Sequence, residues 1–169
     1  MARIKDPIET ADQVIRECDS RNPIKIASIH GIWLRTVNWF EQSGAYAEIA
    51  RKPIIYVSEN LHPVMKNIVI AHELGHHFLH RGKVRRTDCF CEVRIFDMTM
   101  NTMEHEANIF AAQLMLPDDE IIDYIYQGFD IYQIASVMKS DVNLVALKVS
   151  ELKSRGQQFK EQEYKPKFF

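Results

Sequence analysis

The sequence IVIAHELGHHFLH, residues 68–80, places two histidines four positions apart inside an apolar segment of helical length. Residues i and i+4 lie on one face of an α-helix, about 6 Å apart along its axis, so the imidazoles of His72 and His76 can reach one metal ion. Zinc is the ion that such a pair usually binds. The apolar neighbours are typical of a helix buried in a core. The stretch therefore predicts a zinc-binding helix.

Glu73 follows the first histidine directly, which makes it a poor third ligand but lets its carboxylate contact a water molecule at the metal. A carboxylate in that position can take the proton of the water, which then attacks a polarised peptide carbonyl. The motif predicts amide hydrolysis with Glu73 as the catalytic residue. Because the motif specifies only three positions, two histidines without a metal are the alternative interpretation.

The other histidines of this segment are expected to have different roles. His80 lies about 12 Å along the helix from His72, too far to share one ion, and is expected to cap or pack the helix end. His77 faces away from His72 and His76, and we expect it to face solvent or a partner. A zinc protease class with a third histidine at position 82 is excluded, because that residue is Gly82.

The third metal ligand is expected from the sequence TMEHEANIFAAQLMLP, residues 102–117. Its pattern predicts a helix that ends at Pro117 and has small residues on one face. Glu104 shares that face with Ala107, and packing of the face against Gly75 would point Glu104 at the metal. Glu106 lies on the other side of the helix and remains the alternative ligand, and whichever glutamate is not the ligand is expected to be solvated or to support the site.

These segments resemble the ImmA/IrrE family of metallopeptidases over roughly residues 54–117. The resemblance rests on IAHELGHHFLH at 70–80, on Glu104, Ala107, Asn108, Phe110 and Ala111, and on Leu116-Pro117. It implies that His72, His76 and Glu104 hold zinc and that Glu73 is catalytic. It also implies that the substrates are helix-turn-helix repressors of integrative elements, prophages or stress regulons, which are cut to release silenced genes. The motif is intact in this sequence, so nothing in it suggests an inactive enzyme.

Composition narrows the setting in which the chain works. Its 169 residues suffice for one domain with a real core, and a formal net charge of −2 creates no field that attracts nucleic acid or an acidic membrane. The start lacks an apolar signal core and no window approaches a membrane span, so we expect a cytoplasmic protein. The odd set Cys18, Cys89 and Cys91 is expected to be reduced, and Cys89 and Cys91 are only a weak signal for another metal site.

The residues before the zinc-binding helix predict two helices and three strands. Helices are expected at 7–20 and 22–29, and strands at 32–37, 44–49 and 54–57. The fold class is therefore α+β: a small three-stranded sheet, mixed or antiparallel, packed on the zinc-binding helix and the ligand helix. Residues 1–117 are expected to form the zinc metallopeptidase domain. An edge of the sheet could bind an extended substrate as an added strand.

Residues 118–169 are expected to form a C-terminal helical segment packed on that domain, with a frayed tail. Helices are expected at about 118–127, 130–138 and 141–155, and the last two resemble a helix-turn-helix. Packing is favoured over DNA binding, because Asp141 and Glu151 would face phosphates and the second helix has few basic residues. Recognition of a repressor protein is an intermediate possibility.

Two functions are compatible with the sequence: a zinc-dependent endopeptidase that cleaves a repressor, and a metal-stabilised regulatory protein that binds a repressor or DNA without cutting it. The free Glu73 favours the first, because a structural zinc site needs a closed fourth position and no neighbouring base. The basic run at 81–86 and the strand-like stretch 92–96 are expected to form a solvated turn rather than a substrate-contacting loop. The oligomeric state cannot be read from the sequence.

Overall fold

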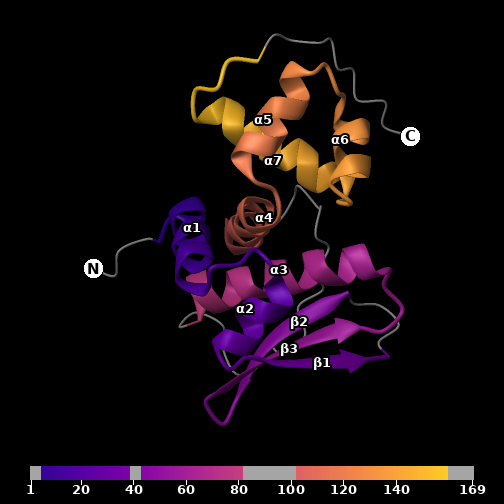
Figure 1. The fold of residues 1–169 in the computed structure, drawn as a ribbon. Coiled ribbons are helices and arrows are strands. Elements are labelled where there is room, and N and C mark those ends of the chain that lie inside the picture. Colours follow the sequence, from indigo (N-terminus) through magenta and orange to yellow (C-terminus); the bar gives the residue numbers. More distant parts are fainter. Residues whose placement is uncertain (1–4, 39–42, 82–101, 160–169) are drawn as a thin grey trace.

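The fold was analysed in a computed structural model, which describes residues 5–38, 43–81 and 102–159 (Figure 1). Its elements are α1 (Pro7–Cys18), α2 (Pro23–Ile29), β1 (Trp33–Val37), β2 (Gly44–Ile49), β3 (Lys52–Ser58), α3 (Pro63–His80), α4 (Thr102–Met115), α5 (Asp118–Tyr126), α6 (Ile131–Val137) and α7 (Val142–Ser154). The predicted α+β class is confirmed. The predictions for 82–101, including Cys89, Cys91 and the strand-like stretch, and for the tail beyond 159 lie outside the described residues.

Helix starts follow local signals in the sequence. Proline stands at the first position of α1, α2 and α3, where its missing N–H has no partner to lose. Asp6 accepts hydrogen bonds from the first turn of α1, and Asn22 does the same for α2. At α6, Asp130 and Gln133 form a reciprocal capping box. These interactions span only a few residues, which is why the helix starts could be predicted from the sequence.

The three strands form a mixed sheet in the order β1-β3-β2. β1 runs parallel to the central strand β3, and β2 runs antiparallel to it. Helix α3 packs against β2 and β3 on one face of the sheet, and α4 packs on the other side of α3 (Figure 1). The sheet thus supports the helix that carries the two-histidine motif, and β1 and β2 are its edges among the strands that the structure describes.

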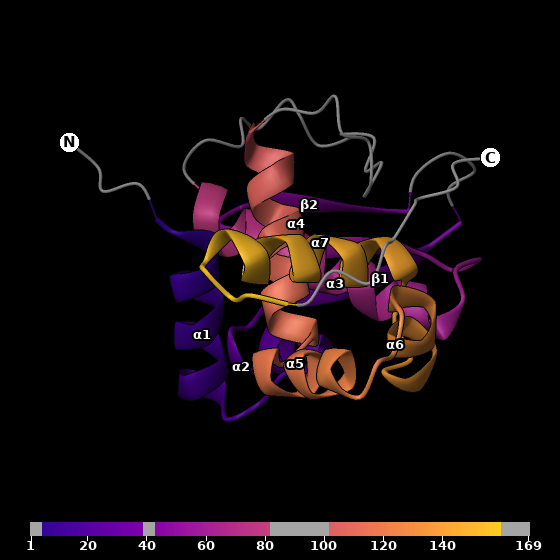
Figure 2. The ribbon, with the colours of Figure 1, turned by 90° about the horizontal axis from the view of Figure 1, so that it is seen from above.

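The C-terminal helices share the hydrophobic core of the helices beneath them. Helix α7 crosses over α4, as the view from above shows (Figure 2). Leu144, Val145 and Leu152 of α7 are at most 1% exposed and belong to the same buried cluster as residues of α3 and α4. The apolar side of the helix-turn-helix-like hairpin is therefore used in packing. The division of the chain at residue 117 stays a prediction.

One charged side chain is buried where these helices meet. Lys148 of α7 is 1% exposed and contacts the side chains of Gln113 and Asp118. Gln113 in turn donates a hydrogen bond to Asp12 of α1. This polar chain connects α1, α4, α5 and α7. Among the described helices, none is long and apolar enough to span a lipid bilayer.

Candidate metal centre

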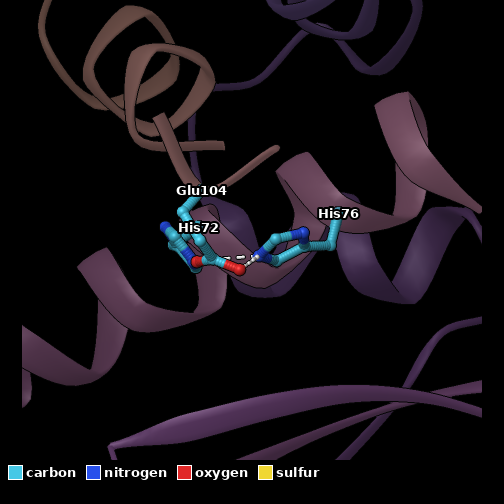
Figure 3. Close-up of side chains that lie close together, drawn as sticks. All are labelled: His72, His76 and Glu104. Atoms are coloured by element: carbon cyan, nitrogen blue, oxygen red, sulfur yellow. Dashed lines mark hydrogen bonds and ion pairs between the residues drawn. The ribbon is translucent and has the colours of Figure 1, made fainter. Parts of the chain in front are cut away.

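His72, His76 and Glu104 converge between α3 and α4 (Figure 3). The Nε2 atoms of the two histidines are 3.1 Å apart. Glu104 Oε2 lies 3.1 Å from His72 Nε2, and Glu104 Oε1 lies 3.3 Å from His76 Nε2. Among the residues that the structure describes, this is the group of His, Cys, Asp and Glu side chains with the spacing of metal ligands.

These distances can be tested against the geometry of a zinc ion. Ligand atoms about 2.0–2.1 Å from a tetrahedral zinc lie about 3.3–3.4 Å from one another. The three distances in the structure are 3.1, 3.1 and 3.3 Å. Two imidazole nitrogens and a carboxylate oxygen at this spacing need protons or a cation between them, because all three present lone pairs. Two imidazoles with one carboxylate are also a set of ligands that zinc uses. The group therefore fits a zinc ion.

The packing of α4 on α3 brings Glu104 to the histidines. Gly75 faces Ala107, which lies one turn after Glu104, and the missing side chain at Gly75 lets the two helices approach closely. The predicted contact between Gly75 and the small-residue face of α4 is confirmed. Glu106 lies elsewhere: its Oε2 is 2.8 Å from Nε2 of His80 rather than beside His72 and His76.

His72 has a buried partner on its second ring nitrogen. Its Nδ1 lies 2.8 Å from Oδ1 of Asn108. An amide oxygen only accepts hydrogen bonds, so Nδ1 carries the proton and donates it to Asn108. The lone pair of His72 is then on Nε2, which faces Glu104. Reasoning from residue periodicity missed this role, although Asn108 lies four residues after Glu104 and so on the same face of α4.

Glu73 is buried next to this group. It is 1% exposed, and its Oε1 has no hydrogen-bond partner among the described residues. Burial raises the pKa of Glu73 to about 7, and the charge of Glu104 adds to the rise, while His76 and a hydrogen bond from the Tyr46 backbone oppose it. Such a carboxyl group exchanges a proton readily near neutral pH, which a general base must do.

Gly44 of β2 keeps the space beside this carboxyl group open. A Cβ added at Gly44 would lie 3.3 Å from Glu73 Oε1 and only 2.3 Å from Cγ1 of Val69. Any larger residue would therefore force the Val69 side chain to move. Of the two edge strands, β2 is the one that touches Glu73.

The expectation that His77 faces solvent or a partner is wrong. His77 is 7% exposed, and its Nδ1 lies 3.0 Å from the hydroxyl group of Tyr46. Burial lowers the pKa of His77 to about 4, so the ring is neutral at physiological pH and shares a hydrogen bond with the tyrosine hydroxyl group. The physical reason is that β2 covers this side of α3, which helical periodicity could not show.

His80 is buried, as the packing expectation requires, but it also has polar partners. Its side chain is 1% exposed, and its two ring nitrogens contact His76 and Glu106. The sequence signal for these polar contacts is the position of His80 one turn after His76.

Comparison with known proteins assigns the class: the chain is similar to metallopeptidases. It is 31% identical over 146 residues to metallopeptidase ImmA of Bacillus subtilis strain 168, covering 83% of this chain and 82% of that protein. It is 32% identical over 146 residues to uncharacterized immunity region protein 2 of Bacillus phage phi105, covering 84% and 89%. Residues 27–150 match the family described as the IrrE N-terminal-like domain, Peptidase_M78. The chain belongs to this family, and the resemblance predicted from its motifs is confirmed.

Proposed function

We propose that this protein is a zinc-dependent endopeptidase that cleaves a helix-turn-helix transcriptional repressor and thereby derepresses genes of a mobile element, prophage or stress regulon. The observation that carries the proposal is the buried carboxyl group of Glu73, whose Oε1 has no partner among the described residues and which lies beside His72, His76 and Glu104. A structural zinc site would have four ligands and no adjacent base. Three candidate ligands and a free carboxylate oxygen describe an open, catalytic site.

Each residue has a defined task in this proposal. His72, His76 and Glu104 hold the zinc ion, which when bound polarises the scissile carbonyl group and lowers the pKa of water. Glu73 accepts the proton of the attacking water at Oε1 and passes it to the leaving amine. The Tyr46 backbone N–H holds the Glu73 carboxyl group in place while that proton moves.

The substrate class is supported from two directions. The motif resemblance implies helix-turn-helix repressors, and one relative is named as a protein of a phage immunity region. An endopeptidase also needs an extended substrate segment, and β2, whose residue Tyr46 touches Glu73, lies at the edge of the sheet formed by the described strands. A substrate strand added along β2 would pass the base and the metal. We expect the cleavage to take place in the cytoplasm, where a transcriptional repressor acts.

The proposal is tested by incubating the zinc-loaded protein with the repressor encoded by the same genetic element. We expect two repressor fragments, whose masses identify the scissile bond. Glu73→Gln keeps the shape of the side chain but removes the base, so it should bind zinc and fold normally while cleavage falls by several orders of magnitude. Glu120→Gln, at an exposed position on α5, is the matched control and should cleave normally.

Cleavage by zinc-loaded Glu73→Gln at the wild-type rate would refute the role of this carboxylate. Inactivation of the repressor by this variant without fragments would show instead that the protein acts by binding.

A further inference from the structure

His76 makes a second buried contact on the side of its ring that faces away from Glu104. Its Nδ1 lies 3.2 Å from Nδ1 of His80. The other ring nitrogen of His80, Nε2, lies 2.8 Å from Oε2 of Glu106 on α4. The His80 side chain is 1% exposed and the Glu106 side chain is 23% exposed. A continuous hydrogen-bonded chain thus leads from the surface through His80 to His76.

The direction of the hydrogen bonds that connect Glu106, His80 and His76 follows from the chemistry of the Glu106 carboxylate. A carboxylate can only accept, so Nε2 of His80 carries a proton and donates it to Glu106. When His80 is neutral, its single N–H is the one on Nε2, which leaves a lone pair on Nδ1. The hydrogen atom between the two Nδ1 atoms must then belong to His76. His76 is thereby held with its own lone pair on Nε2, 3.1 Å from Nε2 of His72.

We propose that His80 and Glu106 are positioning residues that hold His76 in the tautomer and orientation required for binding zinc. The proposal rests on the zinc site proposed above and assigns a role to two residues outside it. A metal-bound histidine commonly donates its other N–H to a carboxylate or an amide oxygen, which fixes the ring and strengthens the ligand. Here the carboxylate of Glu106 acts on His76 through a second imidazole.

Residues of α4 then orient both histidine ligands, but they do so in different ways. His72 donates directly to Asn108 of α4, whereas His76 donates to His80, which Glu106 of α4 orients. Glu104, Glu106 and Asn108 lie within little more than one turn of α4, so one helix supplies the third ligand and an anchor for each histidine. This arrangement also gives Glu106 a function without placing it at the metal.

The decisive experiment measures the affinity for Zn²⁺ by competition with a chromophoric chelator. Glu106→Met keeps the length of the side chain but removes the acceptor, whereas Glu106→Gln keeps an oxygen that can accept from His80. We expect Glu106→Met to weaken zinc binding by about 10–100-fold and Glu106→Gln to retain most of the affinity. His105→Ala, at the exposed neighbouring position, is the control and should bind as the wild type does.

A second pair of variants tests whether Glu106 acts on His76 through His80, an arrangement called the relay below, or whether these side chains only pack together. His80→Asn places an amide oxygen near the position of Nδ1, where it can accept from His76 without help from Glu106. In the His80→Asn background, Glu106→Met should therefore cause little further loss, so the double-mutant cycle is non-additive. Additive losses would contradict the relay. If His80→Asn does not fold, the two Glu106 variants, at a partly exposed position, decide the question alone.

Proton positions can be observed directly by two-bond ¹H–¹⁵N correlation spectra of the zinc-loaded protein. We expect His80 to carry its proton on Nε2 in the wild type and to populate both tautomers in Glu106→Met. Wild-type zinc affinity in Glu106→Met, or a proton on Nδ1 of His80 in the wild type, would overturn the relay and leave the proposed peptidase standing. Failure of the wild-type protein to bind Zn²⁺ would overturn the metal site and the relay together.

Discussion

Gly75 and Ala107 lie backbone to backbone where α3 crosses α4. A Cβ added at Gly75 would be 2.9 Å from Cα of Ala107 and 3.1 Å from its carbonyl oxygen. Ala107 is one turn after Glu104, so this contact sets the distance between the glutamate and the two histidines on α3. The missing side chain at Gly75 thus permits the close approach of the two helices that carry the candidate metal ligands.

Gly75→Ala should therefore destabilise the protein and weaken its zinc binding. Alanine is favoured over glycine inside a helix by about 1 kcal/mol, but here the added methyl group meets backbone atoms that cannot rotate away. Overpacking of this kind typically costs about 1–3 kcal/mol. Urea denaturation and chelator competition measure the two effects. A more stable variant with unchanged zinc affinity would show that the helix crossing adapts.

Replacement of the two glutamates of α4 should affect zinc binding to different degrees. We expect about one zinc ion per chain in the wild type and loss of zinc from Glu104→Ala, because two histidines alone hold the ion weakly. Glu106→Ala should still bind zinc when the metal is in excess, since its carboxylate contacts His80. Equilibrium dialysis against excess Zn²⁺ gives the occupancies. The reverse result, with zinc lost only from Glu106→Ala, would exchange the two roles.

The buried Lys148 predicts an asymmetric response to removal of its partners. Asp118→Ala leaves the ammonium group buried beside Gln113 without its carboxylate, and breaking such a pair should cost about 2–4 kcal/mol, because Asp118 is partly solvated. Lys148→Met removes the buried charge itself and should cost less or stabilise the protein. Free energies of unfolding in urea provide the comparison. Equal losses in both variants would contradict the argument.

The same ion pair should make stability sensitive to acid. Burial alone would raise the pKa of Asp118, but the hydrogen bond and charge of Lys148, with Arg155, outweigh it and lower the pKa below its ordinary value. As the pH falls, Asp118 therefore becomes protonated in the unfolded chain before it does so in the folded protein. The stabilisation by this ion pair is present above about pH 4 and is lost as the pH falls toward the pKa of Asp118 in the folded protein. Unfolding free energies at about pH 5 and pH 3 should differ more in the wild type than in Lys148→Met.

Truncation after Pro117 tests whether the C-terminal helices are a separable unit. It would remove Leu144, Val145 and Leu152, which are buried in one cluster with residues of α3 and α4. We expect the shortened chain to be insoluble or largely unfolded, because the face of α4 that packs against α7 would be exposed to solvent. Expression trials and circular dichroism measure this. A folded, zinc-binding truncation would show that residues 1–117 form an independent domain.

Several features could be read from the sequence because the interactions behind them are local. Helix starts at Asp6, Asn22 and Asp130 depend on side chains that reach two or three residues ahead. The spacing of His72 and His76 follows from the helical repeat. Three short apolar segments ahead of α3 were sufficient to predict a three-stranded sheet, and β-propensity with turn residues is again a local property.

The tertiary structure alone decided which distant groups meet. Periodicity allowed either Glu104 or Glu106 to approach the histidines, and the contact at Gly75 brings Glu104 to them and Glu106 to His80. The strand order β1-β3-β2 and the burial of His77 beneath β2 were equally hidden. Each depends on the relative placement of segments far apart in the chain, which is set by the sum of many packing contacts and not by any short stretch of sequence.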